Sequence, residues 1–154
     1  MALHITTLLA GVFFGMIFSQ RTVQSEPDTS SIALAIENLQ SDRGNVHVAV
    51  YDREESFAKS LKPFQLKIQK VSAGGRLHIQ LDSLPHGRYA LAVYHDENGN
   101  GDLDKNMLGI PKEPYGFSNN PRAKWSAPTY EETSFVLGAM RTSLAVSLKK
   151  WKER

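Results

Sequence analysis

Apolar and polar side chains alternate with a period of two along most of this chain, which is typical of half-buried β-strands. Ile32, Leu34 and Ile36 share one parity, and the valines at 46 and 48 repeat the pattern. Residues 88–95 are apolar at both parities, as expected of a central strand covered on both faces. The predicted strands cover residues 31–39, 45–52, 64–69, 77–81, 88–95, 134–137 and 144–148.

Turn residues between these segments predict how neighbouring strands pair. Ser41–Gly44 separates the first two strands, and Gly74–Gly75 separates the third from the fourth, so we expect two hairpins. In the second hairpin the alternate apolar residues of 64–68 would face the core. Residues 54–61 are the best candidate for a short helix. About seven strands and little helix predict an all-β sandwich with one long ordered loop.

The segment Leu84–Tyr89 carries a local signature of Greek-key sandwiches. A turn places Gly87 two residues before Tyr89, which opens the central strand. This arrangement resembles a tyrosine corner, in which the phenol bonds to the backbone of the turn while the ring packs in the core. We therefore expect a structural Tyr89 in a seven-stranded, Ig-like Greek-key sandwich.

The N-terminal segment predicts export. Residues 5–18 are uncharged and mostly apolar, too short to span a bilayer but of the length of a signal-peptide core. Cleavage is expected after Ser19 or Ser25, although residues 1–4 lack lysine and arginine, so an uncleaved anchor or a buried helix stays open as an alternative. The predicted organisation is a signal peptide over 1–25, a linker over 26–31, a domain over 32–150 and a basic tail over 151–154. The expected location is periplasmic or secreted, with no stable membrane span after cleavage.

Composition narrows the chemistry. The 154 residues include no cysteine, which excludes disulfides, thiolate zinc sites and a cysteine nucleophile. The net charge of +2 is too small to indicate a nucleic-acid partner. The oligomeric state cannot be inferred from the sequence. His47 and His78 fall on the polar parity of their strands, so we expect both to face solvent.

An oxygen-rich loop directly follows the central strand. Asp96, Asn98, Asn100 and Asp104 stand at the first, third, fifth and ninth positions of a calcium-loop pattern, and glycine occupies the sixth. The carbonyl of Asp102 would supply the seventh ligand. The twelfth position, normally a bidentate glutamate, is a methionine, and a later acid such as Glu113 could replace it. The pattern favours weak divalent binding, with calcium as the expected ion, and leaves open a metal-free turn in which Asp and Asn bond local backbone.

The segment 87–104, GRYALAVYHDENGNGDLD, continues into LGIPKEPYGFSNN at 108–120 and APTYEE at 127–132. This composite motif closely resembles the bacterial DUF2141 family, and the resemblance covers residues 32–148. The resemblance implies an exported β-sandwich similar to transthyretin-like (prealbumin-like) or carboxypeptidase-regulatory modules, without an established activity. Trp125-Ser126-Ala127 stands where the family more usually has glycine and proline, which affects the local loop.

The long segment 105–133 shows no convincing alternation, yet its aromatic residues argue against disorder. One interpretation is a loop that caps one end of the sandwich; the other is a recognition surface for a sugar or a peptide. His95 ends the central strand and is expected to be a core residue or to support the loop. The candidate ligand contacts are His95, Tyr115, Phe117, Asn119, Trp125 and Tyr130.

Two classes of function follow from these features. The first is a non-enzymatic module of the cell envelope that binds a ligand such as a glycan or a peptide through a loop organised by a divalent ion. The second is a calcium-dependent hydrolase or lyase that acts on an envelope polysaccharide or peptide, using His95 with the acids of the loop. No separate acid–base pair is evident, and no catalytic residue is assigned, so the binding module is favoured.

Overall fold

A computed structural model describes residues 28–72, 75–122 and 126–151. The predicted signal peptide, Gly74 and Trp125 lie outside these residues. The first strand begins at Thr29, within the predicted linker. Within the described ranges, no helix has the length and apolar character needed to cross a membrane.

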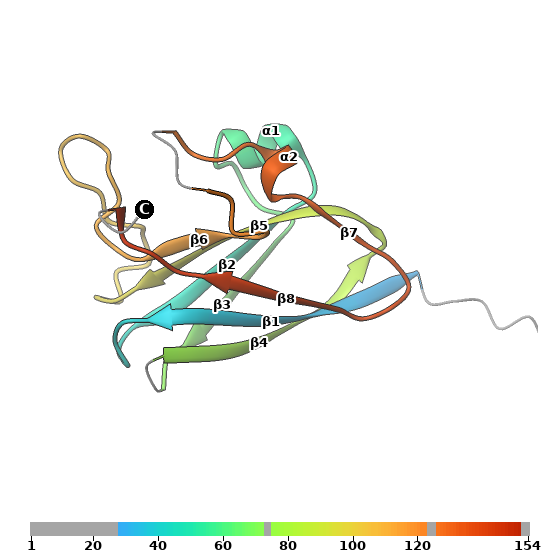
Figure 1. Ribbon diagram of the computed structural model, residues 1–154, viewed down its shortest axis with the longest axis horizontal. Helices are drawn as coiled ribbons and strands as arrows, with labels where there is room; N and C mark the ends of the chain where they lie inside the picture. The colour runs from blue at the N-terminus through green and yellow to red at the C-terminus, as the bar shows by residue number, and fades with distance from the viewer. Residues whose placement is uncertain (1–27, 73–74, 123–125, 152–154) are drawn as a thin grey trace, which may run out of the picture.

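The described residues form two β-sheets and two short helices, so the all-β prediction is confirmed (Figure 1). The three-stranded sheet has the order β4-β1-β8, and β8 runs parallel to β1. Its bounds are β1 Thr29–Leu39, β4 Gly75–Pro85 and β8 Thr142–Ser147.

The five-stranded sheet has the order β3-β2-β5-β6, and β7 also pairs with β5. Eight strands are present in the described chain instead of the predicted seven, because the long loop contains β6. Residues 105–133 are therefore partly regular. The bounds are β2 Asn45–Tyr51, β3 Gln65–Lys70, β5 Gly87–Asp96, β6 Tyr115–Phe117, β7 Phe135–Leu137, α1 Glu54–Ala58 and α2 Tyr130–Thr133.

Both predicted hairpins are wrong. β1 pairs with β4 and β8, whereas β2 pairs with β3 and β5, so the turn at 41–44 carries the chain from one sheet to the other. The connection between β3 and β4 crosses between the sheets in the same way. Turn residues fix a change of direction, and they do not fix whether the next strand pairs with the last one or packs across from it.

The main core lies between the two sheets and depends on β5. Leu91 is fully buried and Val93 is 2% exposed, packed against the apolar residues of β1, β2 and β4. The Tyr89 hydroxyl donates to the Pro85 carbonyl at 2.8 Å while its ring is buried, which confirms the tyrosine corner. The prediction that this strand is covered on both faces is confirmed by its burial at both parities.

The outer face of the five-stranded sheet is more apolar than expected. Register places Leu66 opposite Ala49 and Ile68 opposite His47, so these β3 side chains point outward and are about half exposed. The prediction that they face the core is therefore wrong. Phe57 of α1 and Tyr130 of α2 cover one end of this face, where they pack with Tyr51, Ala90 and Phe117.

His47 also differs from its prediction. It lies on the outer face, but its ring stacks on Tyr94 with 4.5 Å between centroids, and the residue is only 5% exposed. His78, on the edge strand β4, is exposed as expected. An outward-facing residue on a central strand can thus be buried by its cross-strand neighbour and the loops above it.

The contrast between β5 and β3 gives a matched test of the fold. Leu91→Ala should lower the free energy of unfolding by about 2–5 kcal/mol through cavity formation. Leu66→Ala removes the same atoms from a half-exposed site and should cost about 1 kcal/mol or less. Urea unfolding of the two variants measures both values, and equal losses would contradict the assignment of faces.

Candidate functional site

The acidic loop, residues 96–104, is organised by the first carboxylate after β5. Asp96 is fully buried, and its Oδ1 accepts the backbone N–H of Gly99 at 2.7 Å and of Asn100 at 3.2 Å. Its Oδ2 accepts the N–H of Gly101 at 2.9 Å. One side chain therefore satisfies three donors of its own loop and folds the loop around itself.

The Asp96 carboxylate is kept ionised by these bonds. Burial by itself would raise the pKa of Asp96, but the donors at 99–101 and the nearby His47 lower it below its ordinary value. The His47 Nε2 lies 3.5 Å from Asp96 Oδ2. Tyr94 donates from its hydroxyl to the Gly101 carbonyl at 2.8 Å, and that hydroxyl is 3.0 Å from His47 Nδ1. Burial and then the charges of three acids raise the pKa of Tyr94 to about 12.

A second buried carboxylate closes the acidic loop. Glu113 is 5% exposed, and its two oxygens accept the N–H of Glu97 at 2.9 Å and of Asp104 at 3.1 Å. The backbone of Lys112 also donates to the Asp104 carbonyl at 2.8 Å. Glu113 thus joins both ends of the acidic loop to the segment that leads into β6.

Asn98 and Asn100 of the remaining predicted metal ligands meet at Asp104. The amide groups of Asn98 and Asn100 donate to its two oxygens at 2.7 and 3.2 Å. Asp102 is exposed, and its N–H donates to the side chain of Asn100 at 2.9 Å. The six predicted ligands are therefore divided, because Asp96 and Glu113 bind backbone N–H groups. In the described part of the chain, no group of three or more His, Cys, Asp or Glu side chains converges as a metal site.

The turn at 41–44 packs against the start of the acidic loop. His95 is fully buried, and its Nε2–H donates to the Arg43 carbonyl at 2.7 Å. Gly44 has a φ of +74°, and a Cβ there would lie 1.9 Å from the Asp96 carbonyl oxygen. A larger residue cannot fit without moving the base of the loop. The interpretation of His95 as a core residue is confirmed, and this burial removes it from the surface that could meet a ligand.

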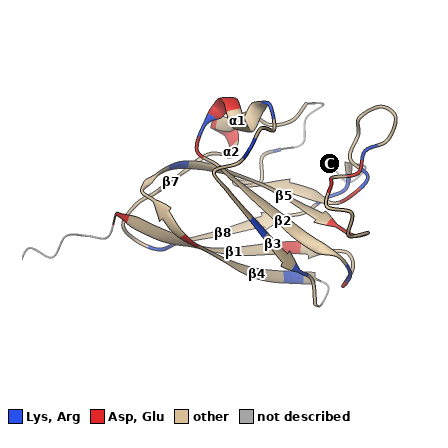
Figure 2. Ribbon diagram, turned by 180° about the vertical axis from the view of Figure 1, so that it is seen from behind, with Lys and Arg blue, Asp and Glu red and all other residues tan. Residues whose placement is uncertain are grey.

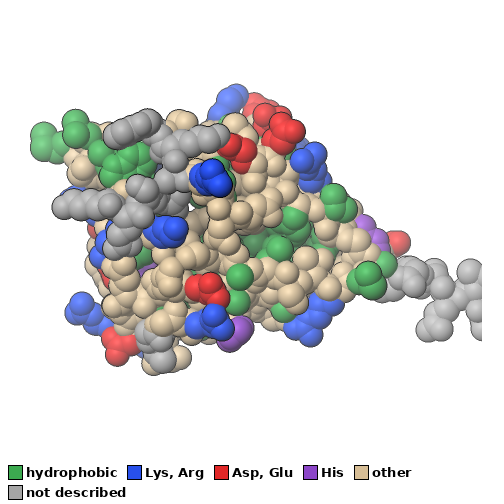
Figure 3. Space-filling model, viewed as in Figure 1, with side chains coloured by type: hydrophobic (Ala, Val, Ile, Leu, Met, Phe, Trp, Pro, Cys, Tyr) green, Lys and Arg blue, Asp and Glu red, His purple; other side chains and the backbone are tan. Residues whose placement is uncertain are grey.

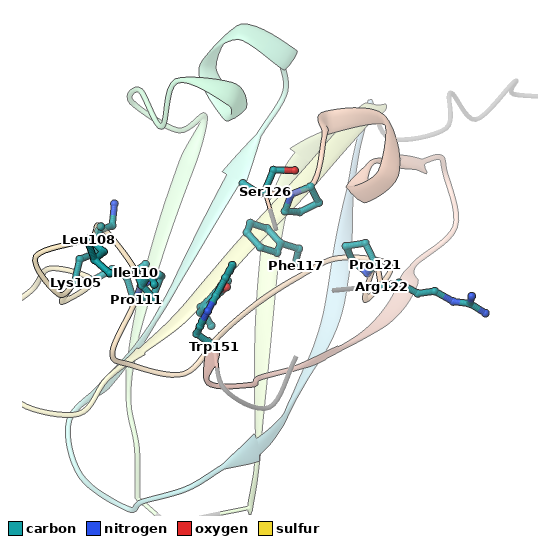
Figure 4. A pocket seen from close by; sticks show the side chains of 14 residues that line it. Lys105, Leu108, Ile110, Pro111, Phe117, Pro121, Arg122, Ser126 and Trp151 are labelled. Carbon is teal, nitrogen blue, oxygen red and sulfur yellow. The ribbon is translucent and has the colours of Figure 1, made fainter. Parts of the chain in front are cut away.

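A cavity of about 510 Å³ lies beside the projecting loop, which we define as residues 105–111. Figure 4 places Phe117 near its centre and Trp151 beside it. Of the predicted ligand contacts, Tyr115 and Phe117 line this cavity, and Tyr130 lines a neighbouring cavity of about 320 Å³ that shares Phe117. The apolar lining comprises Leu103, Leu108, Ile110, Pro111, Tyr115, Phe117, Pro121, Ala127, Pro128 and Trp151.

β6, the strand that carries Phe117, packs closely against β8 at Gly116. A Cβ at Gly116 would lie 2.8 Å from a methyl of Val146 and 2.9 Å from the Ser147 carbonyl oxygen. Because glycine lacks that atom, β6 can approach the last strand, and Tyr115 and Lys149 form a backbone bridge. This bridge leads the chain to Trp151 at the cavity.

Asn119 has a structural place instead of the predicted contact. Its amide donates to the Glu132 carbonyl at 3.3 Å and to the Ser134 carbonyl at 2.9 Å, which fastens the end of α2. Trp151 was missed as a site residue, because the sequence places it in a basic tail. The signal that could have found it is an aromatic side chain among lysines directly after the last strand.

The projecting loop is a hydrogen-bonded turn that exposes apolar side chains. The side chain of Asn106 accepts the N–H of Leu108 at 2.9 Å and of Ile110 at 3.0 Å. Met107 is fully exposed, and 82% of Leu108 is exposed. Figure 2 shows a tip without charged residues, and Figure 3 shows hydrophobic side chains gathered on this side of the molecule.

The comparison with protein families assigns the chain. The model of a family described as an uncharacterized protein conserved in bacteria, DUF2141, matches residues 34–145. The chain belongs to this family. The DUF2141 match includes the acidic loop, Glu113 and Phe117, and it ends before Trp151. No curated protein and no solved structure matches the chain.

The lowered pKa of Asp96 gives a pH-dependent prediction. Its bonds stabilise the folded state above the carboxyl's unfolded pKa of about 3.9, and this contribution is lost as pH falls through the lower folded value. Asp96→Asn should therefore cost about 2–4 kcal/mol at about pH 7 and less at about pH 3. Urea unfolding at both pH values measures the gap.

The exposed Asp102 supplies the control for this prediction. Asp102→Asn should change the free energy of unfolding by about 0.5 kcal/mol or less at either pH. A gap between wild type and Asp96→Asn that stays constant with pH would show that the loss comes from altered packing and not from the ionised carboxylate.

Proposed function

We propose that this DUF2141 protein is an exported, non-enzymatic module of the cell envelope, periplasmic or secreted, that binds a ligand in the cavity around Phe117. The observation that carries the proposal is the chemistry of the lining. It is formed mainly by aromatic, proline and aliphatic side chains, and none of its described residues is Asp, Glu or His. Apolar concave sites of about 300–1,000 Å³ are typical of small-ligand binding.

The positions of the acidic residues support binding over catalysis. A general acid or base must reach a substrate proton, and Asp96 and Glu113 instead hold backbone N–H groups within the acidic loop. His95 is fully buried against the turn at 41–44. Asp96, Glu113 and His95, which a calcium-dependent hydrolase or lyase would use, are therefore engaged in supporting the loop, and no further observation favours that alternative.

We also infer a Greek-key, Ig-like or prealbumin-like topology for the sandwich. The tyrosine corner at Tyr89 supports it, since this arrangement is typical of Greek-key sandwiches. In such folds, loops at the end of a rigid sandwich commonly carry the binding residues. The projecting loop and the cavity occupy this place in the proposed arrangement.

The proposed ligand is a glycan or a peptide of the envelope, held against aromatic faces. Trp151 and Phe117 offer flat apolar surfaces, on which sugar rings or proline-rich chains can stack. Trp151→Ala should weaken binding of any ligand identified from a glycan and peptide panel by about tenfold or more, a loss of about 1.4 kcal/mol or more. Titration calorimetry measures the two affinities.

Leu66→Ala is the matched control, because Leu66 is an exposed apolar residue of β3 that does not line the cavity. It should bind the same ligand as tightly as wild type. Circular dichroism would establish that both variants are folded. Equal binding by wild type and folded Trp151→Ala would place the ligand site elsewhere.

A weak calcium site at Asp104 is part of the proposal. The observation in its favour is that Asn98, Asn100 and Asp104, predicted as ligands from their spacing, do meet in space. Turning the two amides would direct their carbonyl oxygens toward the position that a cation beside Asp104 requires, and it would break the bonds that these oxygens accept from the N–H groups of Asn100 and Asp102. With Asp96 and Glu113 engaged by backbone N–H groups, few ligands remain, so we expect a dissociation constant near the weak end of extracellular modules, about 1 mM.

Calcium should therefore stabilise the protein modestly. At about 10 mM calcium and a dissociation constant of about 1 mM, the gain is about 1.4 kcal/mol. For this domain that corresponds to an increase in Tm of about 4–7 °C after prior chelation. Asp104→Ala should remove the increase, and Glu97→Ala should retain it. An unchanged Tm of the chelated wild type at saturating calcium would leave the loop as a metal-free turn.

A further inference from the structure

The charge around the cavity defines the ligand class more narrowly than its apolar lining does. Lys105 and Arg122 are the charged residues among the described residues that line it. Neither cation has an ion-pair partner in the described chain. The described lining holds these two cations and no carboxylate, and the oxygens of Asp104, which precedes Lys105, accept the amides of Asn98 and Asn100. Such a cavity is complementary to a ligand with an apolar body and a negative end.

The two cations lie at opposite ends of the cavity. In Figure 4 the guanidinium of Arg122 points away from Phe117 and Trp151, whereas Lys105 lies at the other end of the cavity beside Leu108. Lys105 is exposed, and its backbone pairs with Pro111 at the base of the projecting loop. Its position on the rim is therefore fixed by the loop, while its flexible side chain can follow a headgroup.

The projecting loop extends the apolar surface beyond the cavity. Leu108 lines the cavity and is still 82% exposed, and Met107 next to it is fully exposed. The turn is held by the Asn106 side chain and by the Asn106 N–H, which donates to the Ile110 carbonyl at 2.9 Å. The exposed side chain of Leu108 thus extends the apolar surface from the cavity toward Lys105, and a long apolar chain can lie along it.

We propose that the cavity binds a single-chain anionic amphiphile, with its hydrocarbon chain against Phe117 and Trp151 and its carboxylate or phosphate at Lys105. This inference rests on the proposed binding function of the cavity and puts an anionic amphiphile in place of the glycan or peptide as its ligand. The same chemistry is offered by a free fatty acid and by a lysophospholipid with one acyl chain.

The decisive experiment compares ligands that share one chain length and differ in the headgroup. Below their micellar concentrations, decanoate, decyl phosphate, decanol and decyltrimethylammonium are titrated into the folded protein and followed by calorimetry. We expect decanoate or decyl phosphate to bind about tenfold tighter than decanol, and the cationic ligand to bind weakest. Preference for the carboxylate indicates a fatty-acid ligand, and preference for the phosphate indicates a lysophospholipid.

A charge variant tests the position of the headgroup. Lys105→Gln should reduce the affinity for the anionic ligand by about tenfold and leave that for decanol unchanged. Lys67→Gln, which removes a lysine of β3 remote from the cavity, is the matched control and should leave both affinities unchanged.

The contrary outcomes distinguish failure of the proposed ligand class from failure of the proposed binding function. Equal affinity for decanoate and decanol overturns the anionic inference and leaves the proposed binding function intact. If no amphiphile binds while a glycan or peptide does, the amphiphile inference alone fails; if nothing binds, both fail. Co-sedimentation with phosphatidylglycerol vesicles that Leu108→Ser abolishes and Lys105→Gln does not would indicate docking on a membrane surface, and would also overturn it.

Discussion

Burial of β5 on both faces is the constraint on which the rest of the structure depends. One face contributes Leu91 and Val93 to the core between the sheets, and the other carries Ala90 against the helices α1 and α2. With both faces buried, its backbone groups need partners within the sheet, and the strand pairs with β2 on one side and with β6 and β7 on the other. Its last residue, Asp96, then begins the acidic loop inside the protein, where an ionised carboxylate requires several donors.

From this strand the site is built by short-range contacts. Asp96 and Glu113 together close the acidic loop. Glu113 is followed by Pro114, whose carbonyl accepts the N–H of His95 at 2.9 Å, and this bond fixes the start of β6 against β5. The aromatic wall at Phe117 therefore depends on carboxylates that never reach the cavity. The acidic side chains beside the cavity hold backbone N–H groups, so a motif with calcium-loop spacing organises its loop through its own backbone.

The burial of single residues and the turns could be predicted from the sequence, whereas the pairing of the strands could not. Burial of Leu91 follows from apolar residues at both parities, and the tyrosine corner follows from Gly87 and Tyr89. Alternation in β3 indicated a strand, but it could not tell that Leu66 faces outward, because the register against β2 is set by tertiary packing. The position of Trp151 at the cavity could not be predicted for a related reason, because it depends on the contact of β6 with β8 that Gly116 permits. The meeting of Asn98, Asn100 and Asp104 did follow from their spacing.

The parallel pairing of β1 with β8 has a consequence for the order of assembly. Ile32 lies opposite Thr142 and Glu37 opposite Ser147, so the middle strand of the three-stranded sheet lacks one neighbour until almost the whole chain is available. Contacts of such long sequence separation carry a large loop-closure cost and slow folding. A chain that emerges from a ribosome with its N-terminus first therefore completes the three-stranded sheet only after β8 has been synthesised.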